Sequence, residues 1–219
     1  MGISVMILGA SGSGKSASMR NFSGNDVAIL NVASKPLPFR NKNGLKMANK
    51  ATYEMIKGAV SSNRAPSYVI DDAQYLMAFE SFAKANETGY GKFTVMAKNY
   101  EEMLRYVQEE TSSDTIVYVM QHIETDENGK VKAKTLGKML DQQLTVEGLF
   151  TIVLLCEADE TGHHFITQSD GTNPAKSPMG MFDSVKIDND LKMVDDAIRD
   201  YYGLKKPKNT SKSTTAKAE

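Results

Sequence analysis

A glycine-rich segment near the start of the sequence has the residue types and spacing of a phosphate-binding loop. Residues 9–16 read GASGSGKS and fit G-x-x-x-x-G-K-[ST] at every fixed position. Glycines let the backbone N–H groups converge on an anion, and a helix that follows adds its positive end. Lys15 would reach the β- and γ-phosphates, and the Ser16 hydroxyl would bind Mg²⁺. ATP and Mg²⁺ are therefore the expected cofactors. The expected nucleotide-binding residues are Gly9, Ala10, Ser11, Gly12, Ser13, Gly14, Lys15, Ser16 and Ala17.

Two adjacent carboxylates end an apolar run farther along the chain. Residues 68–70 read YVI, typical of a buried strand, and Asp71 and Asp72 follow. We expect Asp71 to hold the Mg²⁺ through water, and Asp72 to orient or deprotonate the attacking water. An equally good interpretation of Asp72 is that it caps the helix that follows.

A further polar residue, Gln121, ends the apolar run at 115–121 (TIVYVMQ). At the end of a neighbouring strand its amide would sense whether a γ-phosphate is present. Lys15, Asp72 and Gln121 are therefore the candidate catalytic residues. The alternative for Gln121 is a polar strand end without a special role.

Apolar runs rich in Val, Ile and Tyr alternate with helical patterns. Strands are predicted at residues 3–9, 27–33, 67–71, 115–121 and 149–156. Helices are predicted at residues 14–22, 51–62, 73–86, 97–111, 136–147 and 190–202. Continuous apolar runs are typical of parallel strands that are covered on both faces. The predicted fold is α/β, a mostly parallel sheet flanked by helices on both faces, of the P-loop NTPase class.

Three long polar segments connect these elements, at residues 34–50, 86–96 and 122–135. Long loops in a compact domain are usually functional or disordered. Asn128-Gly129 in the third segment predicts a hairpin turn. Residues 1–203 are expected to form one domain, and residues 204–219 a disordered, lysine-rich tail.

Composition narrows the class of protein. The 219 residues, 41% of them hydrophobic, suit one sizeable core, and the net charge of −1 means that any nucleic-acid binding must be local. No apolar run approaches the about 18 residues that span a membrane, and one cysteine excludes an internal disulfide, so a cytoplasmic protein is expected. Cys156 is expected to be a buried thiol. It forms no zinc-ligand pattern with the histidines, and His163 and His164 are expected on the solvent face of a short strand.

The order of these features resembles the minimal core of the RecA-like strand-exchange recombinases, above all the short RecA-like ATPases of phage recombination systems. The phosphate loop, the acids at 71–72, the Gly/aromatic segment at 86–96, a strand that ends in glutamine and a basic loop follow one another over residues 1–203. In RecA-type proteins, a glutamine at the position of Gln121 couples the γ-phosphate to the second of two DNA-facing loops, which residues 122–138 would match here. Such proteins also carry a glutamate after the second strand, where this chain has Ser34-Lys35-Pro36, so Asp72 is the substitute base.

The resemblance implies that residues 86–96 and 122–138 face single-stranded DNA. Aromatic side chains in the first segment would stack on bases, and lysines in both would contact phosphates. The alternative is that both segments are merely solvated and that their aromatics pack on the body of the protein. The candidate DNA-binding residues are Tyr90, Lys92, Phe93, Lys130, Lys132 and Lys134.

The expected function is that of an ATP-binding and ATP-hydrolysing protein, slow or DNA-stimulated, that acts on single-stranded DNA in phage recombination, annealing or strand pairing. Its expected partners are single-stranded DNA, further copies of the chain in a ring or filament, and a single-strand-binding protein, but no membrane. The expected location is the cytoplasm of a bacterial host if the chain is phage-encoded. The alternative is a nucleotide-switched assembly or scaffold ATPase without DNA binding. Few arginines disfavour a small-molecule phosphotransferase.

Overall fold

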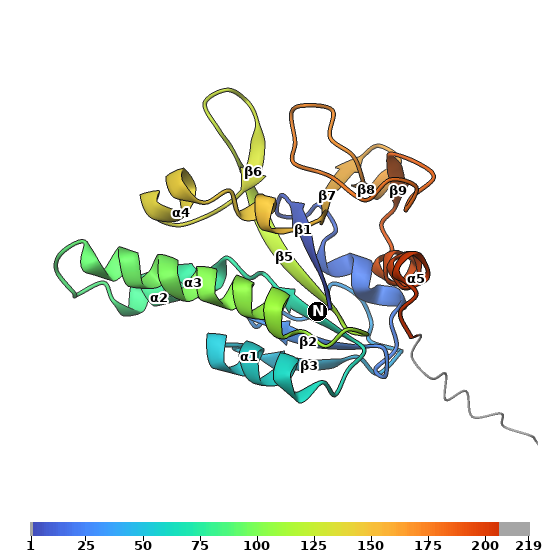
Figure 1. Cartoon of the computed structure of the whole chain (residues 1–219), viewed down its shortest axis with the longest axis horizontal. Coiled ribbons are helices and arrows are strands. Elements are labelled where there is room, and N and C mark those ends of the chain that lie inside the picture. Colours follow the sequence, from blue (N-terminus) through green and yellow to red (C-terminus); the bar gives the residue numbers. More distant parts are fainter. Residues whose placement is uncertain (1, 206–219) are drawn as a thin grey trace, which may run out of the picture.

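The structure, a computed structural model, describes residues 2–205 and is built on a nine-stranded sheet (Figure 1). The strands are β1 (Ile3–Gly9), β2 (Val27–Asn31), β3 (Lys46–Asn49), β4 (Ser67–Asp71), β5 (Ile116–Thr125), β6 (Val131–Ala133), β7 (Ile152–Asp159), β8 (Gly162–Ile166) and β9 (Lys186–Asp188). Their order is β3-β2-β4-β5-β1-β7-β8-β9, with β6 paired to β5. The pairs from β3 to β7 are parallel, and those of β6, β8 and β9 are antiparallel. The predicted α/β, mostly parallel sheet is confirmed.

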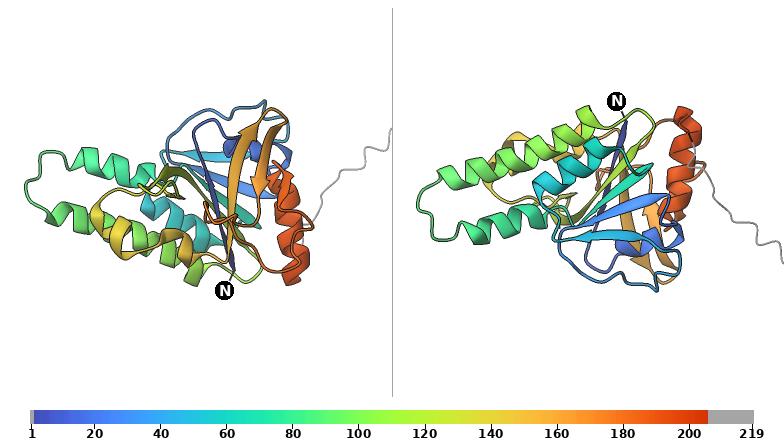
Figure 2. Two further views of the ribbon diagram at one scale, coloured as in Figure 1. Left: turned by 90° about the horizontal axis from the view of Figure 1, so that it is seen from above. Right: turned by 90° about the horizontal axis from the view of Figure 1, so that it is seen from below.

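Helices cover both faces of this sheet, as predicted (Figure 2). The helices are α1 (Tyr53–Ser62), α2 (Tyr75–Ala83), α3 (Gly91–Glu110), α4 (Lys138–Gln143) and α5 (Leu191–Tyr202), with short 3₁₀ helices η1 (Ser16–Asn21) and η2 (Val146–Leu149). Alternate residues of β1 explain the arrangement: Met6 and Leu8 pack with α1 and α3, whereas Val5 and Ile7 pack with η1 and α5. Because both faces are buried, the strands read as continuous apolar runs. None of the described helices is both long and apolar enough to cross a membrane.

Several boundaries differ from the predictions. The predicted helix at 14–22 is the 3₁₀ helix η1, and the predicted loop at 34–50 contains β3, which pairs with the edge of β2. The predicted helix at 136–147 is divided into α4 and η2. Of the predicted tail at 204–219, residues 206–219 lie outside the described residues.

Helix α3 begins six residues earlier than the predicted boundary at residue 97, inside the predicted loop at 86–96. Its first five residues include Thr94 and Val95, β-branched residues of low helix propensity. Met96 and Tyr100 lie one turn apart and are 1% and 0% exposed. Burial of that face outweighs the weak local propensity.

The hairpin predicted at Asn128-Gly129 is present. β5 continues to Thr125, four residues beyond the predicted strand, and pairs with β6. Gly129 has φ +77°, a conformation that favours glycine. The Asp126 carboxylate accepts hydrogen bonds from the backbone N–H groups of Asn128 and Lys130, which fixes the turn.

The parallel strands bring their carboxyl ends to one edge. Leu8 of β1 pairs with Gln121 of β5, and Asn31 of β2 pairs with Asp71 of β4. The loops that follow these strands therefore meet at one edge of the sheet, where ligands of open α/β folds bind.

Candidate functional site

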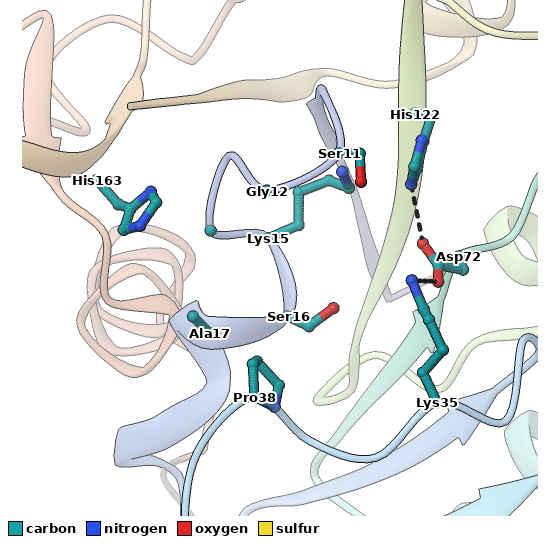
Figure 3. Close-up of a pocket in the computed structure, with 11 residues that line it drawn as sticks. Ser11, Gly12, Lys15, Ser16, Ala17, Lys35, Pro38, Asp72, His122 and His163 are labelled. Atoms are coloured by element: carbon teal, nitrogen blue, oxygen red, sulfur yellow. Dashed lines mark ion pairs between the residues drawn. The ribbon is translucent and has the colours of Figure 1, made fainter. Parts of the chain in front are cut away.

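A cleft of about 340 Å³ opens at this carboxyl edge (Figure 3). The predicted nucleotide-binding residues that line it are Ser11, Gly12, Gly14, Lys15, Ser16 and Ala17. Residues from other elements complete its wall, namely Lys35, Pro38, Asp72, His122 and His163. The cleft thus joins one continuous motif to residues from four distant parts of the chain.

Two glycines shape the loop above the cleft. Gly12 and Gly14 have φ +80° and +102°, which side-chain-bearing residues rarely adopt. A Cβ on Gly14 would also lie 2.9 Å from the His163 ring. Gly9, Ala10 and Ser13 lie outside the cleft lining, and a Cβ on Gly9 would lie 2.7 Å from the Cys156 carbonyl oxygen. The glycine pattern is therefore required by the packing of this loop.

Lys15 is folded against its own loop. Its Nζ donates hydrogen bonds of 2.8 Å to the carbonyl oxygens of Gly9 and Ala10, and the residue is 5% exposed. Burial lowers the pKa of Lys15, an effect that Asp72 and other nearby groups only partly offset. An entering phosphate would replace the two carbonyl contacts with stronger, charge-assisted ones.

Ser16 and Asp71, the two residues predicted to bind Mg²⁺, lie in contact. The Ser16 hydroxyl lies 3.0 Å from both carboxylate oxygens of Asp71, although the two residues are 55 positions apart. Burial, and then the charge of Asp72, raise the pKa of Asp71 to about 6. A carboxylate held in this state gains from a nearby cation.

The residues present fit Mg²⁺ that arrives with a nucleotide. Mg²⁺ usually takes one or two protein oxygens and completes its shell with water and substrate phosphates. Among residues 2–205, no group of three or more His, Cys, Asp or Glu residues is arranged to hold a metal by itself. Ser16 and Asp71 would therefore supply the protein oxygens, and the phosphates would supply others.

Asp72 is buried between two basic side chains. Its carboxylate lies 2.5 Å from Lys35 Nζ and 3.3 Å from His122 Nε2, and the residue is 1% exposed. Burial alone would raise the pKa of Asp72, but His122 and Lys35 outweigh burial and lower it. The helix-capping interpretation is wrong, because α2 begins at Tyr75 without a side-chain cap, and the Tyr75 N–H bonds the backbone carbonyl of Asp72. Its role as a base stays a prediction.

Gln121 does not line the cleft. It is fully buried; its Oε1 accepts a hydrogen bond of 2.5 Å from the Tyr100 hydroxyl, and its Nε2 donates one of 2.6 Å to the Lys134 carbonyl. Side chains alternate along a strand, so Gln121 points towards α3 while His122 points into the cleft. Gln121 therefore does not lie at the expected place beside a γ-phosphate, although its amide contacts the backbone of the segment at 122–138. Its coupling role stays a prediction.

The candidate DNA-binding residues lie on two separate parts of the surface. Tyr90 is 89% exposed at the α2–α3 turn, and the adjacent Lys92 amine bonds the carbonyl oxygens of Lys84 and Glu87. Lys92 Nζ also lies 5.4 Å from the Phe93 ring centroid, and Phe93 is 36% exposed.

The second set of these residues follows the β5–β6 hairpin. Lys130 and Lys134 are exposed there, whereas Lys132 pairs with Glu124 at 3.3 Å. Figure 1 shows the hairpin well apart from the α2–α3 turn. The two segments therefore do not form one continuous patch.

Sequence reasoning gave no role in the cleft to four of its lining residues, Lys35, Pro38, His122 and His163. Lys35 follows the parallel strand β2, and His122 is the last residue of β5 that pairs with β1. Position at the end of a parallel strand is the signal that could have found both. His163 lies on β8, and its Nδ1 donates a hydrogen bond of 2.9 Å to the Ser13 carbonyl oxygen. The short strand predicted for His163 and His164 is present, but His164 is 7% exposed and lies near Glu157 and Asp159 instead of in solvent.

Cys156 is buried as predicted, and its thiol donates to the Ser13 carbonyl oxygen at 2.9 Å. Burial raises the pKa of Cys156 to about 11, so the thiol supports the loop and is a poor nucleophile.

No protein-family model matches the chain, and no curated protein matches it significantly. The functional argument therefore depends on the geometry of the cleft.

Proposed function

We propose that the protein binds Mg²⁺-ATP in this cleft and hydrolyses it, as a RecA-like P-loop ATPase. The observation that carries the proposal is the contact at 3.0 Å between Asp71 and Ser16, the residue that follows Lys15 in the sequence. A hydroxyl and a strand-end carboxylate beside a phosphate-binding lysine are the groups that hold Mg²⁺ on the phosphates of ATP. The cleft volume of about 340 Å³ suits a ligand of that size.

The strand order supports the RecA-like part of the proposal. β5 lies between β1, which leads into the phosphate loop, and β4, which ends at Asp71. Gln121 and His122 on β5 therefore lie between the two halves of the site. A glutamine on a strand beside the phosphate loop fits the resemblance to RecA-type proteins, in which such a residue couples nucleotide to the second loop.

Single-stranded DNA is the partner that we propose for this ATPase, acting in recombination, annealing or strand pairing as an oligomer. The supporting contacts are those of Gln121, whose one amide touches Tyr100 of α3 and the backbone of Lys134. α3 begins next to Tyr90 of the first candidate DNA-binding segment, and Lys134 belongs to the second one, at residues 122–138. A movement of β5 on ATP binding would therefore reach both candidate DNA-binding segments.

The test is Mg²⁺-dependent ATP hydrolysis with and without a single-stranded oligonucleotide, in wild type and Lys15→Ala. Lys98→Ala, which removes an exposed lysine of α3 outside the cleft, is the matched control. We expect hydrolysis that DNA stimulates in wild type and control, and none in Lys15→Ala. Hydrolysis that does not respond to DNA would favour the nucleotide-switched assembly ATPase. If wild type does not hydrolyse ATP at all, the whole proposal is contradicted.

A further inference from the structure

Lys35 enters the cleft from the segment after β2, opposite the phosphate loop (Figure 3). Its backbone is anchored, because the Asn31 side chain donates a hydrogen bond of 2.7 Å to the Lys35 carbonyl oxygen. Its side chain is 55% exposed and reaches across the cleft to Asp72. Because its backbone is anchored and its side chain is largely exposed, the Lys35 amine can move from one partner to another.

The Lys35 amine has an anionic partner that a phosphate can replace. It lies 2.5 Å from Asp72 Oδ2, and a lysine ammonium is a compact charge on a flexible stem. A terminal phosphate in the cleft carries more negative charge than one carboxylate and would compete for this amine. ADP lacks that phosphate and would compete less.

Asp72 can release Lys35 without being left unpaired. Its other oxygen, Oδ1, lies 3.3 Å from His122 Nε2, and that contact does not involve the lysine. A buried carboxylate that loses its last partner is strongly destabilised. Because His122 remains, exchange of the lysine avoids that penalty.

We propose that Lys35 is a second phosphate-binding lysine, which leaves Asp72 for the terminal phosphate of ATP and thereby makes the cleft distinguish ATP from ADP. The same exchange removes one of the two basic partners of Asp72 only when a triphosphate is bound. This inference rests on the proposed function, because it requires a nucleotide in the cleft. It adds a residue that no sequence motif contains.

The experiment compares the Kd of a non-hydrolysable ATP analogue, AMP-PNP, with that of ADP, both with Mg²⁺, by calorimetry. Lys35→Met should weaken AMP-PNP binding about 10-fold and ADP binding less than about 2-fold, since a charge-assisted hydrogen bond is lost only with the triphosphate. Lys42→Met is the matched control, an exposed lysine of the same segment outside the cleft. It should leave both Kd values unchanged.

Two variants of Asp72 separate direct from indirect effects. Asp72→Asn removes the competitor for Lys35, so AMP-PNP should bind more tightly relative to ADP. Lys35→Met/Asp72→Asn should show the same reduced preference for AMP-PNP over ADP as Lys35→Met. If the double variant instead recovers wild-type discrimination, Lys35 acts only by neutralising Asp72 and the proposal is overturned.

An unchanged preference for AMP-PNP over ADP in Lys35→Met would also overturn the inference, while binding of both nucleotides would leave the proposed function standing. If wild type binds neither nucleotide, both fail together. If Lys35→Met does not fold, Asp72→Asn alone decides the question. A preference for AMP-PNP over ADP equal to that of wild type would then show that Lys35 does not leave Asp72 for the terminal phosphate.

Discussion

The nucleotide cleft and the candidate DNA-binding segments are built in opposite ways. In the cleft, polar side chains contact one another, as in the contacts of Ser16 with Asp71 and of Lys35 with Asp72. On the candidate DNA-binding segments, Tyr90 is 89% exposed, and Lys130 and Lys134 are exposed as well. The fold itself therefore fixes the contacts of the cleft side chains, whereas Tyr90, Lys130 and Lys134 are left open to solvent.

One buried side chain is the candidate link between the two regions. Gln121 lies on β5 beside the strand of the phosphate loop, and its amide bonds Tyr100 and the backbone of Lys134. If the regions are independent, substitutions in one should leave the other unchanged. If Gln121 couples them, only its own substitution should affect both.

The largest expected effect is that of Lys15→Ala on nucleotide affinity. The variant should weaken AMP-PNP binding by about 100-fold or more, because a buried ammonium is lost from the phosphates. Its Tm should change little, since burial already disfavours the charged Lys15. DNA affinity without nucleotide should also stay the same, as measured by fluorescence anisotropy. A comparable loss of that affinity would contradict the separation of the two regions.

Asp71→Asn should change how stability depends on pH. The pKa of Asp71 is raised from 3.8 to about 6, so the folded state holds a proton that the unfolded state has released. Wild type should therefore lose stability between about pH 4 and about pH 6, by about 3 kcal/mol. Without Mg²⁺, Asp71→Asn should lack this loss and be the more stable protein at about pH 8.

Urea unfolding across this pH range checks the prediction, with Asp183→Asn as the control for removal of an exposed carboxylate. Parallel pH profiles of wild type and Asp71→Asn would contradict it. Mg²⁺ with AMP-PNP should bring wild type back towards the variant, because the ligands bind only the folded, ionised site.

Gln121→Met tests the link itself. It fills a similar volume but leaves the Tyr100 hydroxyl and the Lys134 carbonyl without their partner, which should lower the free energy of unfolding by about 1–3 kcal/mol. AMP-PNP should still bind, but it should no longer change DNA affinity. Retained coupling in a folded Gln121→Met variant would mean that β5 does not carry the signal through this amide.

The motif residues were predictable because their signal is local. The phosphate loop is one continuous pattern after β1, and Asp71 directly ends an apolar run. The sheet then needs only its parallel order to bring both to one edge. Ser16 and Asp71 accordingly meet where the sequence predicted.

The rest depends on contacts between distant segments. Lys35 was missed because its partner, Asp72, is fixed by the pairing of β2 with β4 and not by sequence spacing. Gln121 faces α3 because one step along a strand reverses the side-chain direction, which the strand end alone does not reveal. The start of α3 was misjudged because Met96 and Tyr100 gain burial that local propensity ignores.

Tyr90→Ala tests the first DNA-binding segment. Loss of one stacked base should weaken binding of a single-stranded oligonucleotide about 10-fold, without a change in basal ATP hydrolysis or Tm. Tyr202→Ala removes an exposed tyrosine of α5 and is the matched control. Equal affinity of Tyr90→Ala and wild type would favour the interpretation that the α2–α3 turn is merely solvated.

The smallest expected effect is that of Lys134→Gln, which changes charge and leaves the backbone link to Gln121 in place. Removing one phosphate contact should lower the slope of log Kd against log salt by about 0.7 and weaken affinity only a few-fold. Acidic neighbours such as Asp126 and Glu127 keep the local field weak, so a larger effect is not expected. Because the carbonyl contact survives, AMP-PNP should still change DNA affinity in Lys134→Gln, unlike in Gln121→Met. If both variants lose that response, the lysine charge and not the buried amide connects the cleft to DNA.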